Sequence, residues 1–249
     1  MKDNFSINSD AYLQYRPLYP DDFFNFLGTI QTNSENAWDC GTGNGQVAQK
    51  LAKLYKNVFA SDISQAQLEN AVKLNNIKYS VQPAESTNFP NNFFDLIVVA
   101  QAVHWFNFDK FYAEVNRTAK NNALLVIMGY GRLQISNEID TLLDNFYYNI
   151  IGSYWDEERK YIDENYQTIP FPFEELNAPK FENAYDWTID HLIGYLGTWS
   201  AVKHYLKNKG INPVDLIYKD LKQAWGEIEK RQINFPLLLR IGEIKNISS

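Results

Sequence analysis

The chain has 249 residues, of which 45% are hydrophobic and 15% aromatic, enough for one large packed α/β domain or a domain with a cap. A formal net charge of −7, with no lysine- or arginine-rich run, argues against a nucleic-acid or anionic-membrane surface. The single cysteine, Cys40, excludes an internal disulfide and a cysteine-rich metal site, and no apolar run suits a signal core or a membrane span, so a cytoplasmic protein is expected.

The first twenty residues form an aromatic arm that contains prolines. The stretch from Tyr12 to Pro20 reads Tyr-Leu-Gln-Tyr-Arg-Pro-Leu-Tyr-Pro and lacks helical periodicity, and its prolines favour extended chain. Such an arm either packs on the domain or lies over a site beside it. Asp21 and Asp22 then begin a short helix that is expected to stop at Gly28.

A strand ending at Asp39 leads into a turn with glycines at positions 41, 43 and 45, and an amphipathic helix follows from Gln46 to Tyr55. This order opens a nucleotide-binding βαβ unit, in which glycines let the backbone approach a ligand and the helix start offers free N–H groups. A dinucleotide fingerprint would place its third glycine later, where Gln46 stands. The carboxylate of Asp39 suits a ligand with an amino group better than a pyrophosphate.

Two acidic residues follow the next two strands, which are expected at 57–62 and 77–81. Asp62 comes about twenty residues after the first glycine, where a carboxylate can accept hydrogen bonds from both ribose hydroxyls of an adenosine. Between the strands, Ser64 is expected to cap a helix. Glu85 could accept from an exocyclic adenine amine, and the alternative is an exposed loop carboxylate.

The run 94–100 is almost continuously apolar, which is typical of a central parallel strand covered on both faces. Ligands of open α/β sheets bind beyond the carboxyl ends of the strands. The loop Gln101-Ala-Val-His-Trp-Phe106 is therefore predicted beside the ligand, with His104 and Trp105 as candidate catalytic residues. Packing between aromatic residues is the alternative role for His104.

Strict alternation of strand and helix ends after a helix begun by Asp109, a turn at Asn121-Asn122 and a fifth strand over 123–130. Apolar residues between 135 and 150 predict a long amphipathic helix. The segment is too long for a plain connection, so residues 132–181 are predicted to be a cap inserted into a domain of residues 1–131 and 182–249. The remaining elements are expected as a sixth strand at 183–188, helices at 191–196, at 200–209 and from 213, and a closing strand at 233–241.

These motifs resemble the class I S-adenosylmethionine-dependent methyltransferases over nearly the full length, and most closely their trans-aconitate methyltransferase-like, small-molecule group. The resemblance implies a Rossmann-like, seven-stranded, mostly parallel sheet with an antiparallel last strand and a mainly helical cap. One departure, Asn121-Asn122 in place of a frequent Pro-Gly turn, affects only local chain geometry. The matching pieces are Tyr15-Arg-Pro-Leu-Tyr-Pro20, Asp39-Cys-Gly-Thr-Gly-Asn-Gly45, Ser61-Asp62, Ala84-Glu85, Gln101-Ala-Val-His-Trp-Phe106 and Thr198-Trp-Ser200.

The cofactor implied by the resemblance is S-adenosyl-L-methionine, and no metal is expected because none of the three histidines has metal-ligand spacing. The faces of Tyr12, Tyr19 and Trp105 are candidates to favour the sulfonium charge. The residues assigned to cofactor binding are Arg16, Tyr19, Asp39, Gly41, Thr42, Gly43, Gly45, Asp62, Ile63, Ala84, Glu85 and Gln101.

The predicted reaction is an in-line methyl transfer to a small, carboxylate-bearing acceptor. An ionised carboxylate needs no general base, so position and exclusion of water would suffice. Arg159 in the cap is the candidate for the acceptor carboxylate, because a guanidinium can bind one through two parallel hydrogen bonds. The alternative is an exposed ion pair of Arg159 with Asp156 or Glu157.

Other functions stay open at this point. A quinone precursor or another carbon or oxygen acceptor is the alternative substrate class. A nicotinamide-dependent oxidoreductase and a cofactor-binding protein without catalysis are alternatives of a different kind. No obligate protein partner is evident.

Overall fold

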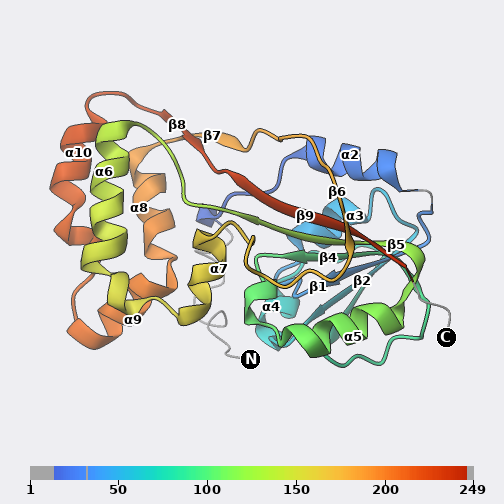
Figure 1. Cartoon of the computed structure of the whole chain (residues 1–249). Helices are drawn as coiled ribbons and strands as arrows, with labels where there is room; N and C mark the ends of the chain where they lie inside the picture. Colours follow the sequence, from blue (N-terminus) through green and yellow to red (C-terminus); the bar gives the residue numbers. More distant parts are fainter. Residues whose placement is uncertain (1–13, 32, 246–249) are drawn as a thin grey trace.

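The chain folds around a seven-stranded sheet in the computed structural model, which describes residues 14–31 and 33–245. The strands lie in the order β3-β2-β1-β4-β5-β9-β6 (Figure 1). Strands β1 to β5 pair in parallel, and β9 runs antiparallel to both of its neighbours. The predicted sheet is therefore confirmed. The bounds are β1 Asn36–Cys40, β2 Asn57–Asp62, β3 Ile77–Val81, β4 Phe94–Ala100, β5 Ala119–Tyr130, β6 Glu174–Leu176 and β9 Leu237–Ile244.

The sheet is covered on both faces, as the apolar run of β4 predicts. Leu96 and Val98 pack into the core on the side of α2 and α3, while Ile97 and Val99 pack on the side of α5. Figure 1 shows α2 and α5 on opposite sides of the sheet. Because both faces of the central strands β1 and β4 are buried, these two strands reach solvent only at their ends. The helices span α2 Asp21–Ile30, α3 Gln46–Leu51, α4 Gln65–Glu69 and α5 Phe108–Thr118.

A helical lobe, made of α6 to α10 with their short connecting turns, lies to one side of the sheet (Figure 1). Its helix α6 continues into a π-helical turn, η2, where a single long helix was predicted. A two-stranded antiparallel sheet of β7 and β8 connects the lobe to β9. The bounds are α6 Asn137–Asn145, η2 Phe146–Ile150, η3 Gly152–Tyr154, η4 Glu157–Arg159, α7 Lys160–Asp163, β7 Ala184–Trp187, α8 Ile189–Gly197, α9 Ser200–Lys209, η5 Pro213–Leu216, α10 Tyr218–Trp225 and β8 Arg231–Asn234.

Several predicted boundaries are wrong for local reasons. Helix α5 is capped by Asn107, whose side chain accepts from the Lys110 N–H, so the cap lies two residues before Asp109. Helix α2 continues through Gly28 to Ile30. Strand β5 already begins at Ala119, and the predicted turn is present only as a register shift against β4, with Asn122 at φ 64°.

The C-terminal strands differ most from the prediction. The predicted sixth strand, β7, pairs with β8 outside the main sheet, and the single closing strand is two strands separated at Pro236, which has no N–H to donate. The short strand β6, and not β7, forms the edge of the main sheet beside β9. Since β6 falls within 132–181 and α8 to α10 fall outside it, the cap boundaries stay a proposal, in which two chain segments build the helical lobe.

Candidate functional site

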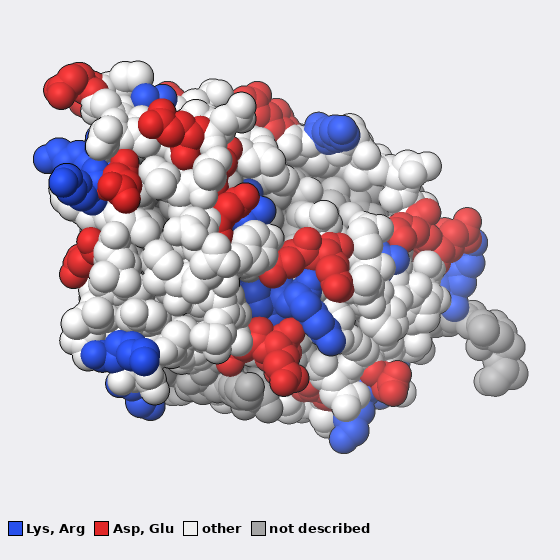
Figure 2. All heavy atoms as spheres, turned by 60° about the vertical axis from the view of Figure 1, so that its left-hand side comes forward, with Lys and Arg blue, Asp and Glu red and all other residues white. Residues whose placement is uncertain are grey.

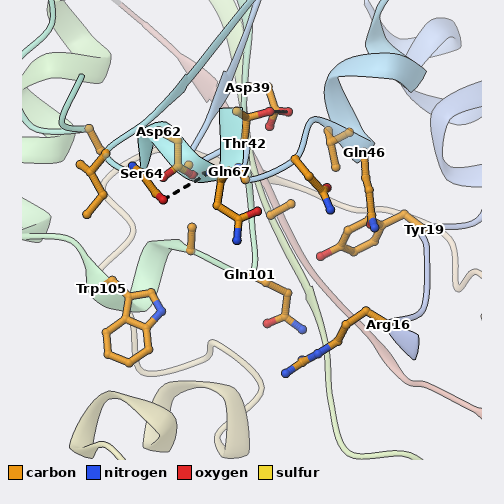
Figure 3. Close-up of a pocket in the computed structure, with 18 of the residues that line it drawn as sticks. Arg16, Tyr19, Asp39, Thr42, Gln46, Asp62, Ser64, Gln67, Gln101 and Trp105 are labelled. Carbon is orange, nitrogen blue, oxygen red and sulfur yellow. Dashed lines mark hydrogen bonds between the residues drawn. The ribbon is translucent and has the colours of Figure 1, made fainter. Parts of the chain in front are cut away.

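A cavity opens at the carboxyl ends of β1, β2 and β4, with about 1040 Å³ of space not filled by atoms and partly open to solvent. Figure 3 shows Asp39 and Asp62 at one end and Trp105, Gln101 and Arg16 at the other. The predicted residues that line it are Arg16, Tyr19, Asp39, Gly41, Thr42, Gly43, Asp62, Ile63, Ala84, Gln101 and Trp105.

The glycine turn lies where the sequence predicts it, and its backbone requires glycine. Gly41, Gly43 and Gly45 have φ values of 70°, 55° and 81°, a region that side-chain-bearing residues rarely adopt. A Cβ on Gly41 would also lie 2.7 Å from the Cβ of Ala102, whereas one on Gly43 would meet nothing closer than 3.9 Å. Gly43 therefore leaves open space on the cavity side of the turn, in which a ligand can approach the backbone.

Asp62 connects the glycine turn to the end of β2 through hydrogen bonds. Its carboxylate accepts the Gly43 N–H at 2.8 Å through Oδ2 and the Ser64 N–H at 2.9 Å through Oδ1. Each carboxylate oxygen has more than one acceptor site, so hydroxyl groups of a ligand can still be bound. Asp62 thus has a structural task besides the predicted ribose contact.

Asp39 is completely buried at the end of β1. Its Oδ2 accepts from the Thr42 hydroxyl, while its Oδ1 has no hydrogen-bond partner among the described residues. Burial raises the pKa of Asp39 to about 7; the Thr42 hydrogen bond and the nearby Ala48 N–H oppose the rise, and the negative charge of Asp62 adds to it. A carboxylate oxygen without a partner in a ligand cavity is expected to meet a donor from the ligand.

Asn44, in the same turn, has the complementary feature. Its side chain is buried, it lines the cavity, and its amide Nδ2 has no hydrogen-bond partner among the described residues. A buried acceptor on Asp39 and a buried donor on Asn44 match the ammonium and carboxylate groups of an amino acid. The sequence offered no signal for Asn44 beyond its place inside the glycine motif.

Glu85 and Gly45 lie outside the set that lines this cavity. The Glu85 carboxylate accepts the Asn107 N–H at 3.0 Å and so connects its loop to the start of α5. Its predicted adenine contact stays a prediction. A Cβ on Gly45 would clash with the Tyr79 hydroxyl, so this glycine is needed for close packing of the turn. Tyr12 lies outside the described residues.

A second cavity adjoins the first under the helical lobe. It holds about 660 Å³ of space not filled by atoms, and Arg16, Gln101 and Trp105 line both cavities. A ligand in the second cavity can therefore approach one in the first. The other lining residues are His104, Trp155, Asp156, Arg159, Ile162, Thr198, Trp199, Ser200 and Lys203, which include the whole Thr198-Trp-Ser200 motif.

Gln101 lies at the boundary between the two cavities, and its backbone is strained, with a φ of 52°. Its side chain donates to the Tyr130 carbonyl at 3.0 Å and accepts from the Tyr166 hydroxyl at 3.3 Å. The same hydroxyl lies 3.4 Å from Nδ1 of His104. Tyr166 is far away in sequence and belongs to no motif, so no sequence pattern indicated its place here.

His104 is buried and is a very weak base in this structure. Burial, with a further contribution from the positive charge of Arg159, lowers the pKa of His104 to about 3. The imidazole is therefore neutral at physiological pH. It can donate or accept a hydrogen bond through its ring nitrogens, but it cannot supply a proton as an imidazolium would.

Arg159 lines the second cavity but has other partners than those the sequence suggested. Its Nε donates to the Tyr147 hydroxyl at 2.7 Å and lies 3.6 Å from a carboxylate oxygen of Asp163. The guanidinium carbon lies 4.7 Å from the centre of the Trp155 ring, within cation–π range. The side chain is 19% exposed, so the alternative of a surface ion pair with Asp156 or Glu157 is not what the structure shows.

Comparisons with known proteins agree with this geometry. The Methyltransferase domain family profile matches residues 38–127. A putative methyltransferase of Dictyostelium discoideum is 35% identical over 245 residues, which cover 95% of this chain and 93% of that protein. The solved structure of a putative type II methyltransferase from Anaeromyxobacter dehalogenans is 37% identical with a TM-score of 0.86, covering 93% of this chain and 99% of that one.

The chain belongs to the S-adenosylmethionine-dependent methyltransferases. A more partial similarity is to the ubiquinone/menaquinone biosynthesis C-methyltransferase UbiE of Rickettsia bellii, 29% identical over 138 residues. That match covers 49% of this chain and 53% of that protein. Membership of the methyltransferase family excludes the alternative of a nicotinamide-dependent oxidoreductase.

The first cavity of this methyltransferase fits its cofactor by the chemistry of its side chains. Asp39 and Asn44 offer a buried acceptor and donor for the amino-acid part, and Asp62 lies at the carboxyl end of the second strand. The described residues contain no group of three or more metal-ligating side chains. On the face drawn in Figure 2, basic and acidic side chains are interspersed and form no basic surface of the kind that binds nucleic acid. No helix in the described part of the methyltransferase could cross a membrane.

Proposed function

We propose that this methyltransferase transfers a methyl group to a small carboxylate-bearing acceptor bound in the second cavity. The proposal rests on the charge of the residues that line the second cavity. Three cations, Arg16, Arg159 and Lys203, line that cavity with one carboxylate, Asp156, in a chain of net charge −7. A local excess of positive charge in an acidic protein favours an anionic ligand. The resemblance to the trans-aconitate methyltransferase-like group supports the same substrate class.

Bound in the first cavity, the cofactor supplies an electrophilic methyl group on a sulfonium. We propose that Asp39 accepts from its ammonium, that Asn44 donates to its carboxylate and that Asp62 accepts from its ribose. Tyr19 and Trp105 line the same cavity, and their rings would favour the sulfonium charge. The protein's part in catalysis is then to orient two ligands and to exclude water between them.

The acceptor is proposed to be ionised before it binds. The only histidine that lines either cavity, among the described residues, is His104, whose pKa of about 3 makes it a poor base near neutrality. A carboxylate oxygen is already a nucleophile at that pH, whereas a phenol or an enol carbon must lose a proton. The neutral His104 is left to hydrogen-bond the acceptor and fix its direction.

Arg159 is proposed to face the acceptor carboxylate. Tyr147 and Asp163 engage its Nε, which leaves its two terminal nitrogens without a hydrogen bond to a described residue. These are the nitrogens from which a carboxylate can be bound. Tyr147 and Asp163 would act as positioning residues that hold the guanidinium against Trp155.

Methylation of a quinone precursor is the second candidate, favoured by the similarity to UbiE. The two candidates separate in one assay. The purified protein is given methyl-labelled cofactor and a panel of small mono-, di- and tricarboxylic acids, their neutral amides, and dihydroxy quinone precursors. We expect label on at least one acid and none on its amide. Label on the quinone precursors alone would support the second candidate and contradict the first.

A further inference from the structure

We propose that Lys203 is a direct anion-binding contact for the acceptor and that it decides between carboxylates and their neutral analogues. This inference rests on the proposed function and names a specificity residue for it. Lys203 lies on α9, and no sequence motif drew attention to it. It lines the second cavity together with Arg16, which belongs to the arm before α2, and Arg159, which ends η4.

The three cations differ in what already holds them. Arg16 donates to the Tyr130 hydroxyl at 3.3 Å and to the Thr198 carbonyl at 3.2 Å, and its guanidinium carbon lies 5.4 Å from the centre of the Tyr195 ring. Arg159 has Asp163 as a counter-charge. The amine of Lys203 forms no hydrogen bond or ion pair with any described residue. Of the three, Lys203 is therefore the one whose bonding capacity is entirely left for a ligand.

The surroundings of Lys203 make this lack of a partner costly. The side chain is only partly exposed, and burial together with the positive charge of Arg16 lowers its pKa. A cation held near another cation and partly removed from water is stabilised when an anion enters between them. The cavity that Lys203 lines is the space from which such an anion can come.

The remaining walls indicate what the anion is attached to. Trp155 and Trp199 line the cavity with their rings 5.5 Å apart between centroids, and Ile162 adds an aliphatic side chain. Apolar walls beside a cationic group suit an acceptor in which a carboxylate is joined to a flat or apolar body. Trp105, which lines both cavities, places that body next to the cofactor site.

The test uses the purified full chain loaded with S-adenosylhomocysteine and titrated calorimetrically with phenylacetate, indole-3-acetate, hexanoate and the amide of each acid. Lys203→Met removes the charge and keeps the apolar stem, and Lys203→Arg keeps the charge. The matched control is Lys207→Met, because Lys207 lies one helical turn further along α9 and is exposed. All four proteins are first titrated with S-adenosylhomocysteine alone.

We expect at least one carboxylate to bind the loaded wild type, with its amide binding at least tenfold more weakly. Lys203→Met should weaken binding of that carboxylate at least tenfold and leave binding of its amide unchanged. The carboxylate affinities of Lys203→Arg and Lys207→Met should stay within threefold of wild type. Equal carboxylate affinity in Lys203→Met and wild type would overturn the inference. Failure of every carboxylate to bind the loaded wild type would instead contradict the carboxylate acceptor of the proposed function, and failure of the wild type to bind S-adenosylhomocysteine would contradict its cofactor.

Discussion

Binding of S-adenosylhomocysteine should become tighter as the pH rises through 7, because a buried acid must ionise to receive the ligand's ammonium. Burial raises the pKa of Asp39 to about 7 in the protein without ligand, so a large share of the protein carries the neutral acid below that pH. A neutral carboxyl group is a poor partner for a cation. Binding should therefore release a proton at low pH and none at high pH.

The magnitude follows from the pKa. If only the ionised form binds well, the apparent Kd is multiplied by one plus ten to the power of (pKa minus pH). With a pKa of about 7, that factor is roughly 11 at pH 6 and roughly 1.1 at pH 8, so affinity should rise about tenfold between them. His104 does not interfere, since its pKa of about 3 keeps it neutral across this range.

The same shift has a consequence for stability without ligand. The pKa of Asp39 in the folded protein is higher than its ordinary value of 3.8, so the folded protein holds this proton more tightly than the unfolded chain does. Its contribution to the free energy of unfolding is largest below about pH 4, falls as the pH rises and levels off above about 7. Cofactor binding compensates for that loss.

Calorimetry between about pH 6 and 8, repeated in buffers of different ionisation enthalpy, measures both the affinity and the proton release. Asp39→Asn is the control that cannot ionise. Its affinity should be lower than that of wild type at pH 8 and nearly flat with pH. A flat profile in the wild type, or an equal slope in Asp39→Asn, would refute the assignment of Asp39 to the ammonium.

Substitutions at three further positions test other parts of the site. Asp62→Ala should weaken S-adenosylhomocysteine binding by about 1.5–3 kcal/mol, because it removes a charged acceptor that also holds the Gly43 and Ser64 N–H groups; unchanged affinity by calorimetry would remove Asp62 from the site. Gly43→Val should abolish binding while circular dichroism stays native, since φ 55° and the open space beside Gly43 tolerate no branched side chain together with a ligand; normal binding by the folded variant would contradict that view. Arg159→Ala and Arg159→Lys should both lose turnover on the carboxylate that the panel identifies and keep cofactor affinity, and equal turnover in all three proteins would leave Arg159 with a packing role.

Local sequence pattern was enough to predict the order of the elements in the first half of the fold, although helix α3 ends at Leu51 and not at Tyr55 as predicted. The strand before Cys40, the glycine turn and the following helix are encoded by neighbouring residues, because positive φ values and amphipathic periodicity are local properties. Ser64 caps α4 as expected. The end of β4 is likewise recognised from its nearly continuous apolar run, which places the His104 loop beside the cavities.

The second half was harder because its contacts are distant in sequence. Strand β6 has three residues, two of them glutamate, and it is defined by pairing with β9 and by the Arg240–Glu175 ion pair. Periodicity cannot reveal so short an edge strand. Lys203 and Tyr166 reach the site from α9 and from the turn after α7, and only the packed lobe shows that they line or support the same space as Gln101.

The atom that receives the methyl group tests the central claim most directly. A product made with methyl-labelled cofactor and an acidic acceptor is isolated and treated with mild alkali. A methylated carboxylate is an ester, so we expect the label to leave as methanol and the original acid to be recovered. Label that stays on the acceptor after alkali would show transfer to carbon, nitrogen or an ether oxygen and would contradict the account.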